Sequence, residues 1–411
     1  MRLFDVEGID YKFIHTGQHH DYDLFLKFIE DFNIRKPDYN INLTPSSGSI
    51  EQISQMMPNI GGLLKEIHPS SVIVEGDTNS VVAAALATIK SKIPLIHLEA
   101  GLRSYDWRTP EEHNRRIVDH VSNVLLAPTA QSEKNLRKER VQGKIFMVGN
   151  TVIDAVGLCL QQLQQHHDSN KRQKSILNKI SLEMDPTNYV LLTLHREENV
   201  DNPDSLKHIL SAISNSGLNC ICPMHPRTLK RIHEYGFEDL ISSTATIKVI
   251  EPVGYLDFLT LLSTCKFVIS DSGGIQEEVT SPYINKHALI LRNSTERPES
   301  ILSGHTIMCP VNYNEIRLSI KKIELGEDLP QKQNICPYGD GNSAYKILKV
   351  LKSSVTLTRP LITYKKMQFD DVPLPEQHKQ VPQPEITSVV PGRAPAPNAI
   401  ESASAAVNKD I

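Results

Sequence analysis

Short runs of apolar and β-branched residues alternate along the chain with longer segments in which apolar positions recur every three to four residues. The short runs predict buried strands, and the longer periodic segments predict helices. Strands that alternate with helices form βα units, which build parallel sheets. The sequence therefore predicts an α/β fold with strands at 11–15, 72–75, 94–98, 124–127, 145–148, 189–194, 218–223, 246–250, 267–270 and 288–291.

The alternation is interrupted by a polar, lysine-rich segment at 169–182 and then resumes. Two doubly wound domains explain the interruption, because single cores rarely grow beyond about 250 residues. We expect an N-terminal Rossmann-like domain at 1–160, joined by a C-terminal helix near 341–360, and a second Rossmann-like domain at 161–340. Residues 368–411 are rich in proline and small polar residues, which cannot bury enough surface to fold, so we expect a disordered tail.

Composition narrows the classes of partner. Lys and Arg total 44 against 48 Asp and Glu, and no dense basic run occurs, so neither nucleic acid nor a membrane surface is expected as a partner. There is no signal peptide and no apolar stretch of about 18 residues, so we expect a soluble, cytoplasmic protein. The six scattered cysteines match neither a disulfide framework nor zinc-ligand spacing, so we expect reduced core residues and no bound metal.

Titratable residues stand directly after predicted strands. Ligands of open α/β sheets bind outside the carboxyl ends of the strands. Asp77, Glu99 and His195 follow three such strands, and Glu111 lies in the segment after Glu99. Acid–base chemistry at carbon needs titratable groups gathered in this way, because burial and mutual repulsion spread their pKa values. These four residues are the candidate catalytic group, in a cleft between the domains.

Each of these residues also has an ordinary structural explanation. Asp77 could cap a helix, and Glu111 could pair with Arg115 four residues later. His195 could be a packed histidine at the end of a strand.

A glycine-rich turn at 271–278 joins a predicted strand to a helix. Ser272-Gly273-Gly274 would let the backbone approach an anion at a helix N-terminus, and Glu278 one turn later could accept hydrogen bonds from ribose hydroxyls. The alternative is a tight turn in which Ser272 caps the helix and the acidic residues complement the helix dipole. Neither a Walker loop nor a dinucleotide fingerprint is present.

Nine motifs fall in the order seen in the non-hydrolysing UDP-N-acetylglucosamine 2-epimerases, a family that the chain resembles from residue 11 to about 350. They are Thr16-Gly-Gln-His19, Gly76-Asp-Thr78, His97-Leu-Glu-Ala-Gly-Leu-Arg-Ser104, Pro110-Glu-Glu-His-Asn-Arg115, Val148-Gly-Asn-Thr151, His195-Arg-Glu-Glu-Asn199, Asp271-Ser-Gly-Gly-Ile-Gln-Glu-Glu278, Thr295-Glu-Arg-Pro-Glu299 and Pro337-Tyr-Gly-Asp-Gly341.

The resemblance implies two Rossmann-like domains in the GT-B arrangement, with UDP held mainly by the second. It implies interconversion of UDP-N-acetylglucosamine and UDP-N-acetylmannosamine without a redox cofactor. The proton on carbon 2 would leave as UDP is expelled, and UDP would add back to the glycal after reprotonation on the opposite face. Such a product would supply surface polysaccharide or glycan synthesis, and we expect a homodimer.

The motifs also imply roles for single residues. Carboxylates are needed around carbon 2, and donors are needed near the departing diphosphate. The resemblance assigns acid–base roles to Asp77, Glu99, Glu111 and His195, the last also near the phosphates; diphosphate binding to Ser272, Gly273 and Gly274; ribose binding to Glu278; uracil binding to Val253 and Phe258; and supporting roles to Arg103, Arg115, His225 and Arg292.

Two motifs depart from the family pattern. Glu197 stands where the family has arginine, so one positive charge near the phosphates is lost. Ser46-Ser-Gly-Ser49 stands where many bacterial members carry an Arg-Gln pair that binds a second, activating substrate molecule. We therefore expect no strong activation by substrate, although Gln18 and His19 are present.

The start of the chain also departs from the family. Residues 1–8 match the end of the family's first helix, with Gly8 in the C-cap position, and residues 9–15 match its second strand. The first strand and its Gly-Thr-Arg-Pro-Glu loop, roughly 25 residues, are absent, and this strand is central in a doubly wound sheet. We hypothesise a misplaced start or a truncation. This chain should then fold poorly and show little activity, and an upstream-extended form should restore both.

Four other functions stay open. The chain could epimerise another UDP-2-acetamido sugar, or release UDP and free sugar as the hydrolysing branch does. A GT-B glycosyltransferase would share the turn at 271–278 but would not need Asp77, Glu99 and Glu111. A truncated, inactive nucleotide-sugar-binding chain would bind UDP without turnover.

Overall fold

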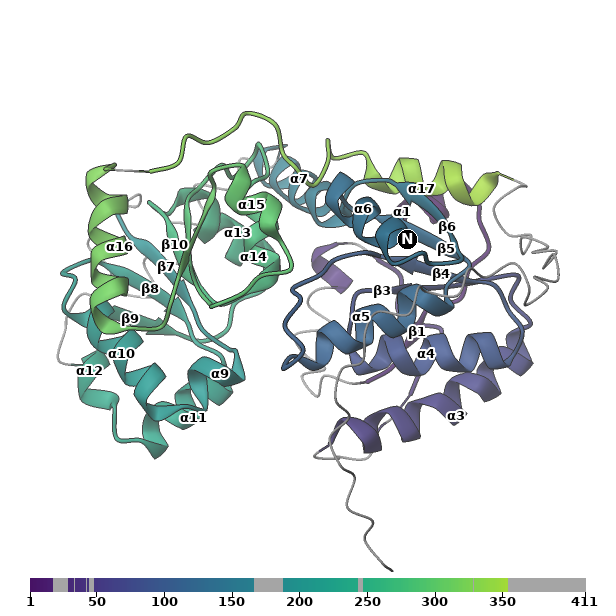
Figure 1. Cartoon of the computed structure of the whole chain (residues 1–411), viewed down its shortest axis with the longest axis horizontal. Coiled ribbons are helices and arrows are strands. Elements are labelled where there is room, and N and C mark those ends of the chain that lie inside the picture. The colour runs from purple at the N-terminus through teal and green to yellow at the C-terminus, as the bar shows by residue number, and fades with distance from the viewer. Residues whose placement is uncertain are drawn as a thin grey trace, which may run out of the picture. The chain divides into compact units, whose positions relative to one another are not determined.

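The computed structural model describes residues 1–17, 29–32, 34–41, 43, 48–165, 188–242, 247–327 and 329–353. Its strands form three parallel sheets of two, four and six strands (Figure 1). The predicted α/β class with parallel sheets is therefore confirmed. The polar segment at 169–182, the tail at 368–411, and Gln18, His19 and Ser46 lie outside the described residues.

The four-stranded sheet keeps the order of the chain: β3 (Val72–Glu75), β4 (Leu95–Leu98), β5 (Val124–Ala127) and β6 (Lys144–Met147). All residues of β5 are buried, as expected when helices cover both faces of a parallel sheet. The described helices of this half include α3 (Ser49–Ile67), α4 (Asn79–Lys90), α5 (Pro110–Val121), α6 (Ala130–Lys138) and α7 (Thr151–Gln165). Met56 of α3 and Ala83 of α4 meet in one hydrophobic cluster.

A separate two-stranded sheet pairs β1 (Ile14–His15) with β2 (Tyr39–Asn40). Ile14 and Val72 pack on the same cluster, yet within the described residues β1 does not pair with β3. β3 is therefore an edge strand, on which Ile73 is 40% exposed. No described strand lies between β1 and β3. α1 (Arg2–Val6) ends one residue earlier than predicted, because Glu7 is its C-cap, and Gly8 follows directly with φ +64°.

The six-stranded sheet has the order β12-β11-β10-β7-β8-β9. The chain runs outward from β7 to β9, returns to the other side of β7, and runs outward again from β10 to β12. β7 and β10 are thus neighbours at a topological switch point, where ligands bind in open α/β sheets. The strands are β7 (Val190–Thr193), β8 (Cys220–Pro223), β9 (Ile247–Ile250), β10 (Val268–Ser270), β11 (Ala288–Leu291) and β12 (Thr306–Cys309).

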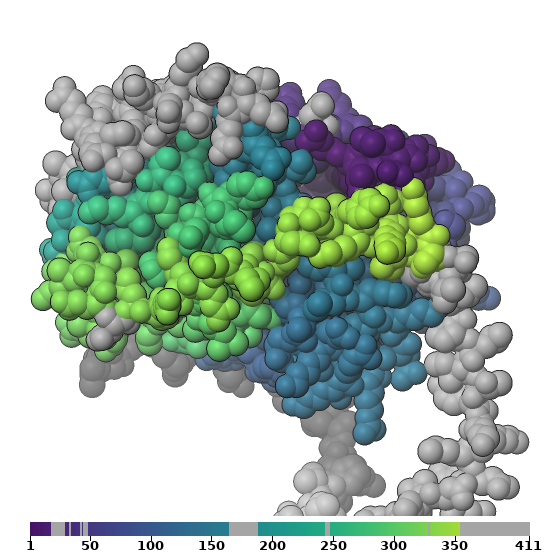
Figure 2. Space-filling model, turned by 90° about the horizontal axis from the view of Figure 1, so that it is seen from above, coloured from purple at the N-terminus to yellow at the C-terminus, as the bar shows by residue number. Residues whose placement is uncertain are grey.

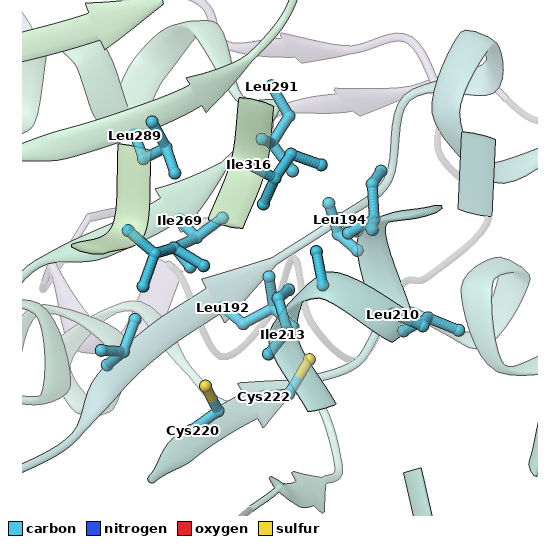
Figure 3. Packing of buried hydrophobic residues seen from close by; sticks show 14 of the residues in the cluster. Leu192, Leu194, Leu210, Ile213, Cys220, Cys222, Ile269, Leu289, Leu291 and Ile316 are labelled. Atoms are coloured by element: carbon cyan, nitrogen blue, oxygen red, sulfur yellow. The ribbon is translucent and has the colours of Figure 1, made fainter. Parts of the chain in front are cut away.

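Eight helices accompany this sheet in the described residues: α9 (Glu197–Val200), α10 (Pro203–Ser214), α11 (Pro226–Glu234), α12 (Glu238–Ser242), α13 (Tyr255–Thr264), α14 (Gly273–Glu278), α15 (Pro298–Leu302) and α16 (Tyr313–Leu325). Consecutive strand residues enter different clusters: Leu192 and Ile269 pack on one face, Leu191 and Val268 on the other. Figure 3 shows the first of these clusters, with Cys220 and Cys222 inside it. All six cysteines are free and buried, as expected.

The last described helix, α17 (Ser343–Lys352), returns to the first half of the chain. Its Ile347 packs with Ile96 and Val124 of the four-stranded sheet, and Lys352 pairs with Glu7. Figure 2 shows this yellow helix beside the purple N-terminal segment. The domain limits at 160 and 340 stay predictions. No helix among the described residues is long and apolar enough to cross a bilayer.

Three strand predictions need correction. The strand predicted at 11–15 has two residues, Ile14 and His15, so its extent was overestimated. β2 and β12 were not predicted: β2 is only two residues long, and β12 is a run of four residues that begins with Thr306.

Candidate active site

Asp77 and Glu99 follow the neighbouring strands β3 and β4, so the sheet brings them to one edge. Glu99 Oε2 approaches within 3.8 Å of the position that a Cβ on Gly76 would take, directly beside Asp77. Glu99 has φ +68°, a backbone conformation that side chains other than glycine rarely adopt and that is often found at functional sites. The structure thus places the first two predicted carboxylates together.

Glu111 lies half-buried in the first turn of α5. Arg115, one turn later, pairs with Asp77 Oδ2 at 2.6 Å and with Glu112 Oε2 at 3.2 Å. The explanation of Glu111 as a partner of Arg115 is therefore wrong. Asp77 does not cap a helix either, because the N-cap residue of α4 is Thr78.

A polar network that the sequence did not assign links Glu99 to the second half of the chain. Asn150 Nδ2 donates to Glu99 Oε1 at 2.7 Å and to Glu277 Oε2 at 3.0 Å. Arg297 Nε donates to Glu277 Oε1 at 2.8 Å, and the same guanidinium pairs with Glu296. Asn150, Glu296 and Arg297 all stand in motifs quoted above, but those motifs did not show which partners these residues meet.

The network returns to the first half through Arg115, whose Nη2 lies 3.9 Å from Glu296 Oε1. Burial works against ionisation of Glu296, but the charges of Arg297, Arg292 and Arg115 outweigh it and hold the pKa of Glu296 far below its usual range. Burial raises the pKa of Glu277 to about 8, with Glu99 adding to the rise and Arg297 opposing it. Two neighbouring carboxylates of one network thus have opposite protonation preferences.

Glu75, the last residue of β3, was also missed. It keeps contact with solvent, but the protein around its carboxyl limits hydration, and the nearby charges of Glu99 and Asp77 add to this effect. Together they raise the pKa of Glu75 to about 7. The chain therefore gathers three carboxylates, Glu75, Asp77 and Glu99, at the ends of β3 and β4.

His195 lies at the switch point of the six-stranded sheet. Its Nδ1 contacts the buried Asp271 Oδ1 at 3.1 Å, and its backbone N–H also donates to Asp271. Burial would raise the pKa of Asp271, but hydrogen bonding and charge from His195, with support from Arg196 and Asn199, lower it. Asp271 thus fixes an exposed imidazole at the end of β7.

Glu197 takes part in a different interaction. It accepts a hydrogen bond from Arg227 Nη1 at 2.9 Å. The residue that departs from the family pattern is thus paired with an arginine of α11.

Ser272 occupies the N-cap position of α14, but its side chain makes no capping hydrogen bond. A Cβ on Gly273 would lie 2.6 Å from Arg297 Nη1 and 2.7 Å from Glu296 Oε1, so any larger residue would have to displace these two side chains. The predicted turn therefore exists, and the Ser272 hydroxyl is not used for the capping that the structural alternative required.

Tyr255 connects the segment of the predicted uracil residues to the predicted ribose residue. Tyr255, at the start of α13, donates to Glu278 Oε1 at 2.8 Å. Val253 and Phe258 flank Tyr255 in sequence and pack, half-buried, against the same hydrophobic cluster as Tyr255. The segment that carries the uracil candidates is thus bonded to the ribose candidate through Tyr255.

The supporting residues have different surroundings. Arg292 Nη2 pairs with Glu296 Oε2 at 3.0 Å and so belongs to the network between the two halves. Arg103 pairs with the buried Asp119 at 2.7 Å. Its ion pairs in the described residues do not include Asp77 or Glu99. His225 caps α11 by accepting the N–H of Arg227.

Known proteins that resemble the chain share this architecture. The family model for UDP-N-acetylglucosamine 2-epimerase matches residues 2–352. The UDP-N-acetylglucosamine 2-epimerase of Methanocaldococcus jannaschii is 39% identical over 357 residues, which are 85% of this chain and 93% of that protein.

Solved structures agree with this match. The UDP-GlcNAc 2-epimerase of M. jannaschii in complex with UDP-GlcNAc and UDP has a TM-score of 0.76 at 38% identity, with 85% and 94% of the two chains covered. The enzyme of Neisseria meningitidis bound to UDP-GlcNAc has a TM-score of 0.72 at 33% identity, with 80% and 89% covered. These neighbours are GT-B-like, which confirms the expected fold class. The resemblance indicated by the motifs is confirmed as well, and the chain belongs to the UDP-N-acetylglucosamine 2-epimerase family.

Proposed function

We propose that the chain epimerises UDP-N-acetylglucosamine at carbon 2 by elimination and re-addition of UDP. The observation that carries this proposal is the bridge that the Asn150 amide forms between Glu99 and Glu277, because it joins the carboxylates at the ends of β3 and β4 to α14. Acid–base groups and an anion-binding turn are the two parts that the reaction requires.

The residue roles belong to the same proposal. Asp77, Glu99 and Glu111 exchange protons at and around carbon 2, and His195, oriented by Asp271, stabilises charge on the departing diphosphate. The diphosphate lies on Ser272, Gly273 and Gly274, the ribose on Glu278, and the uracil on Val253 and Phe258. Arg115 and Arg292 support the carboxylates and the diphosphate through Glu296. Arg103 and His225 keep secondary supporting roles.

The decisive experiment incubates the chain, and an upstream-extended form, with UDP-N-acetylglucosamine in heavy water. NMR should show UDP-N-acetylmannosamine with deuterium at carbon 2, because the proton lost in elimination exchanges with solvent. Free N-acetylmannosamine and UDP would indicate the hydrolysing reaction, and sugar transfer to an added acceptor would indicate a glycosyltransferase. If neither form produces a carbon-2 epimer, the proposal is wrong.

The proposal also covers the oligomeric state, the cellular compartment and the biosynthetic role. The enzyme works as a homodimer in the cytoplasm and supplies a precursor for polysaccharide synthesis. Light scattering coupled to size-exclusion chromatography tests the dimer, since a monomeric mass at working concentrations would contradict it.

Glu278 should give UDP binding a pH dependence. Burial raises the pKa of Glu278 to about 6, although the hydrogen bond from Tyr255 works in the opposite direction. Ribose hydroxyls donate more strongly to an ionised carboxylate, so UDP should bind more tightly as the pH rises from about 5 to about 7.

Glu278→Gln isolates this effect, because the phosphates of UDP titrate equally in both proteins. Calorimetric titrations at several pH values should show weaker binding and a smaller pH dependence in the variant. Identical pH dependence in the parent and the variant would exclude Glu278 from the ribose site.

A further inference from the structure

The orientation of the Asn150 side chain is fixed by its surroundings. Its Oδ1 accepts the backbone N–H of Val152 at 3.1 Å, and a backbone N–H can only donate. The amide nitrogen must therefore point the other way, where its two hydrogens meet Glu99 Oε1 and Glu277 Oε2. The assignment of oxygen and nitrogen follows from this chemistry.

Asn150 is also held through its backbone. Its N–H donates to the carbonyl of Tyr338 at 2.7 Å, and its carbonyl accepts the Ser343 hydroxyl at 3.2 Å. The preceding Gly149 has φ +88°, and a Cβ there would lie 2.5 Å from Ser343 Oγ. With only 2% of its surface exposed, Asn150 cannot turn away from the two carboxylates without breaking several hydrogen bonds.

The two carboxylates belong to different halves of the chain. Glu99 follows β4, whereas Glu277 lies in α14, between Gly273 and Glu278. Glu277 is anchored in turn by Arg297, so the position of Glu99 is tied to the helix that carries the proposed diphosphate and ribose ligands.

We propose that Asn150 is a positioning residue for the epimerisation: its amide holds the Glu99 carboxylate in place for carbon 2 and couples it to α14. This inference rests on the proposed function and adds to it a residue that touches no reacting atom. A misplacement of about 1 Å in an acid–base group can lower turnover about a hundredfold.

The charged groups that face Glu99 determine how it should respond. They are Glu75 from β3, His97 from β4, Glu277 from α14 and Arg297 from the loop before α15. Asn150 places its donor between two of the acidic groups. Asn150→Asp would put an oxygen there instead, so an added negative charge would face the Glu99 carboxyl in place of a donor.

The test follows the Glu99 carboxyl directly by NMR in protein labelled with ¹³C at glutamate carboxyls, with Glu99→Gln used to assign the signal. In Asn150→Asp, the Glu99 carboxyl signal should shift, because a negatively charged oxygen replaces the amide donor beside it. Asn150→Ala, which removes the donor without adding charge and is the safer variant for folding, should shift the same signal in the same direction. Asn123→Asp is the matched control, because Asn123 accepts the Leu95 N–H at the opposite end of the same sheet.

Kinetics provide the second readout. Both Asn150 variants should lower kcat about a hundredfold with unchanged UDP affinity, and the acidic limb of the pH–rate profile should move to higher pH in Asn150→Asp. A purely structural role would reduce the active fraction equally at every pH.

An unmoved Glu99 carboxyl signal in a folded Asn150 variant would overturn the inference. Because that measurement needs no turnover, the inference can be judged even if the parent protein fails to epimerise UDP-N-acetylglucosamine. That failure would instead contradict the proposed function.

Discussion

Asp77→Asn, Glu99→Gln and Glu111→Gln should each lower kcat at least about a hundredfold, because each removes a group that exchanges a proton in the reaction. The three variants are nearly isosteric with the parent residues, so the glycine-rich turn and Glu278 should still bind UDP. The effect should appear in kcat with little change in the UDP dissociation constant, since the interactions lost matter in the transition state.

Steady-state kinetics in an active form of the enzyme, together with calorimetry of UDP binding, measures both quantities. Glu133→Gln is the matched control, because Glu133 is a partly exposed carboxylate that pairs with Arg137 outside the site. Any of the three variants that turns over at nearly the parent rate would remove that residue from the mechanism.

Arg297→Met should destabilise the fold by about 3–5 kcal/mol, the usual cost of removing one partner from a buried ion pair. Arg297 is buried between Glu277 and Glu296, and both carboxylates would lose their principal cation. Urea unfolding at neutral pH measures the loss. Arg137→Met, which breaks an exposed pair with Glu133, should cost less than about 1 kcal/mol.

The ion pair of Arg297 with Glu296 also predicts how the stability of the fold changes at acidic pH. Because the pKa of Glu296 in the folded state is held below its usual range, its contribution to stability is present at neutral pH and is lost as the pH falls through the acidic range. Arg297→Met should weaken this dependence of stability on pH, since Arg297 lowers the pKa of Glu296 more than any other neighbouring cation. A variant as stable as the parent, with the same acid sensitivity, would show that the network carries no net stability.

The pKa of Glu277 is shifted in the opposite direction to that of Glu296, so its effect on stability changes with pH in the opposite sense. Its pKa is raised to about 8, so the folded state favours its neutral form and stability is lost as the pH rises toward that value. The pH range below the usual glutamate pKa therefore reports on Glu296, and the range from that pKa up to about 8 reports on Glu277.

Local pattern was sufficient for the strands and for the turns that follow them. β3, β5 and β11 have the predicted limits. β5 and β11 are continuous apolar runs that are buried along their whole length, whereas β3 is a short β-branched run that ends at Glu75. Gly273 could be singled out because a strand, a glycine pair and a helix start follow one another in the sequence. The acidic residues after β3 and β4 could be predicted to meet, since parallel neighbours end at the same edge of a sheet.

Partners of single charges could not be predicted in this way. The i,i+4 rule made Glu111 the partner of Arg115, yet Arg115 reaches Asp77, whose loop is placed by a different strand. Glu112, the less conspicuous of the two neighbouring carboxylates, is the one that Arg115 contacts on its own helix.

The sequence by itself determined the α/β class, the family and the set of candidate residues, because these depend on hydrophobic period and on motifs that are contiguous in the chain. Only the tertiary structure decided that β7 and β10 are neighbours, that Asp271 orients His195, and that Asn150 joins Glu99 to Glu277. These contacts join residues that are 51 to 127 positions apart. Their geometry is set by the order of strands and by helix packing, which periodicity along the chain does not encode.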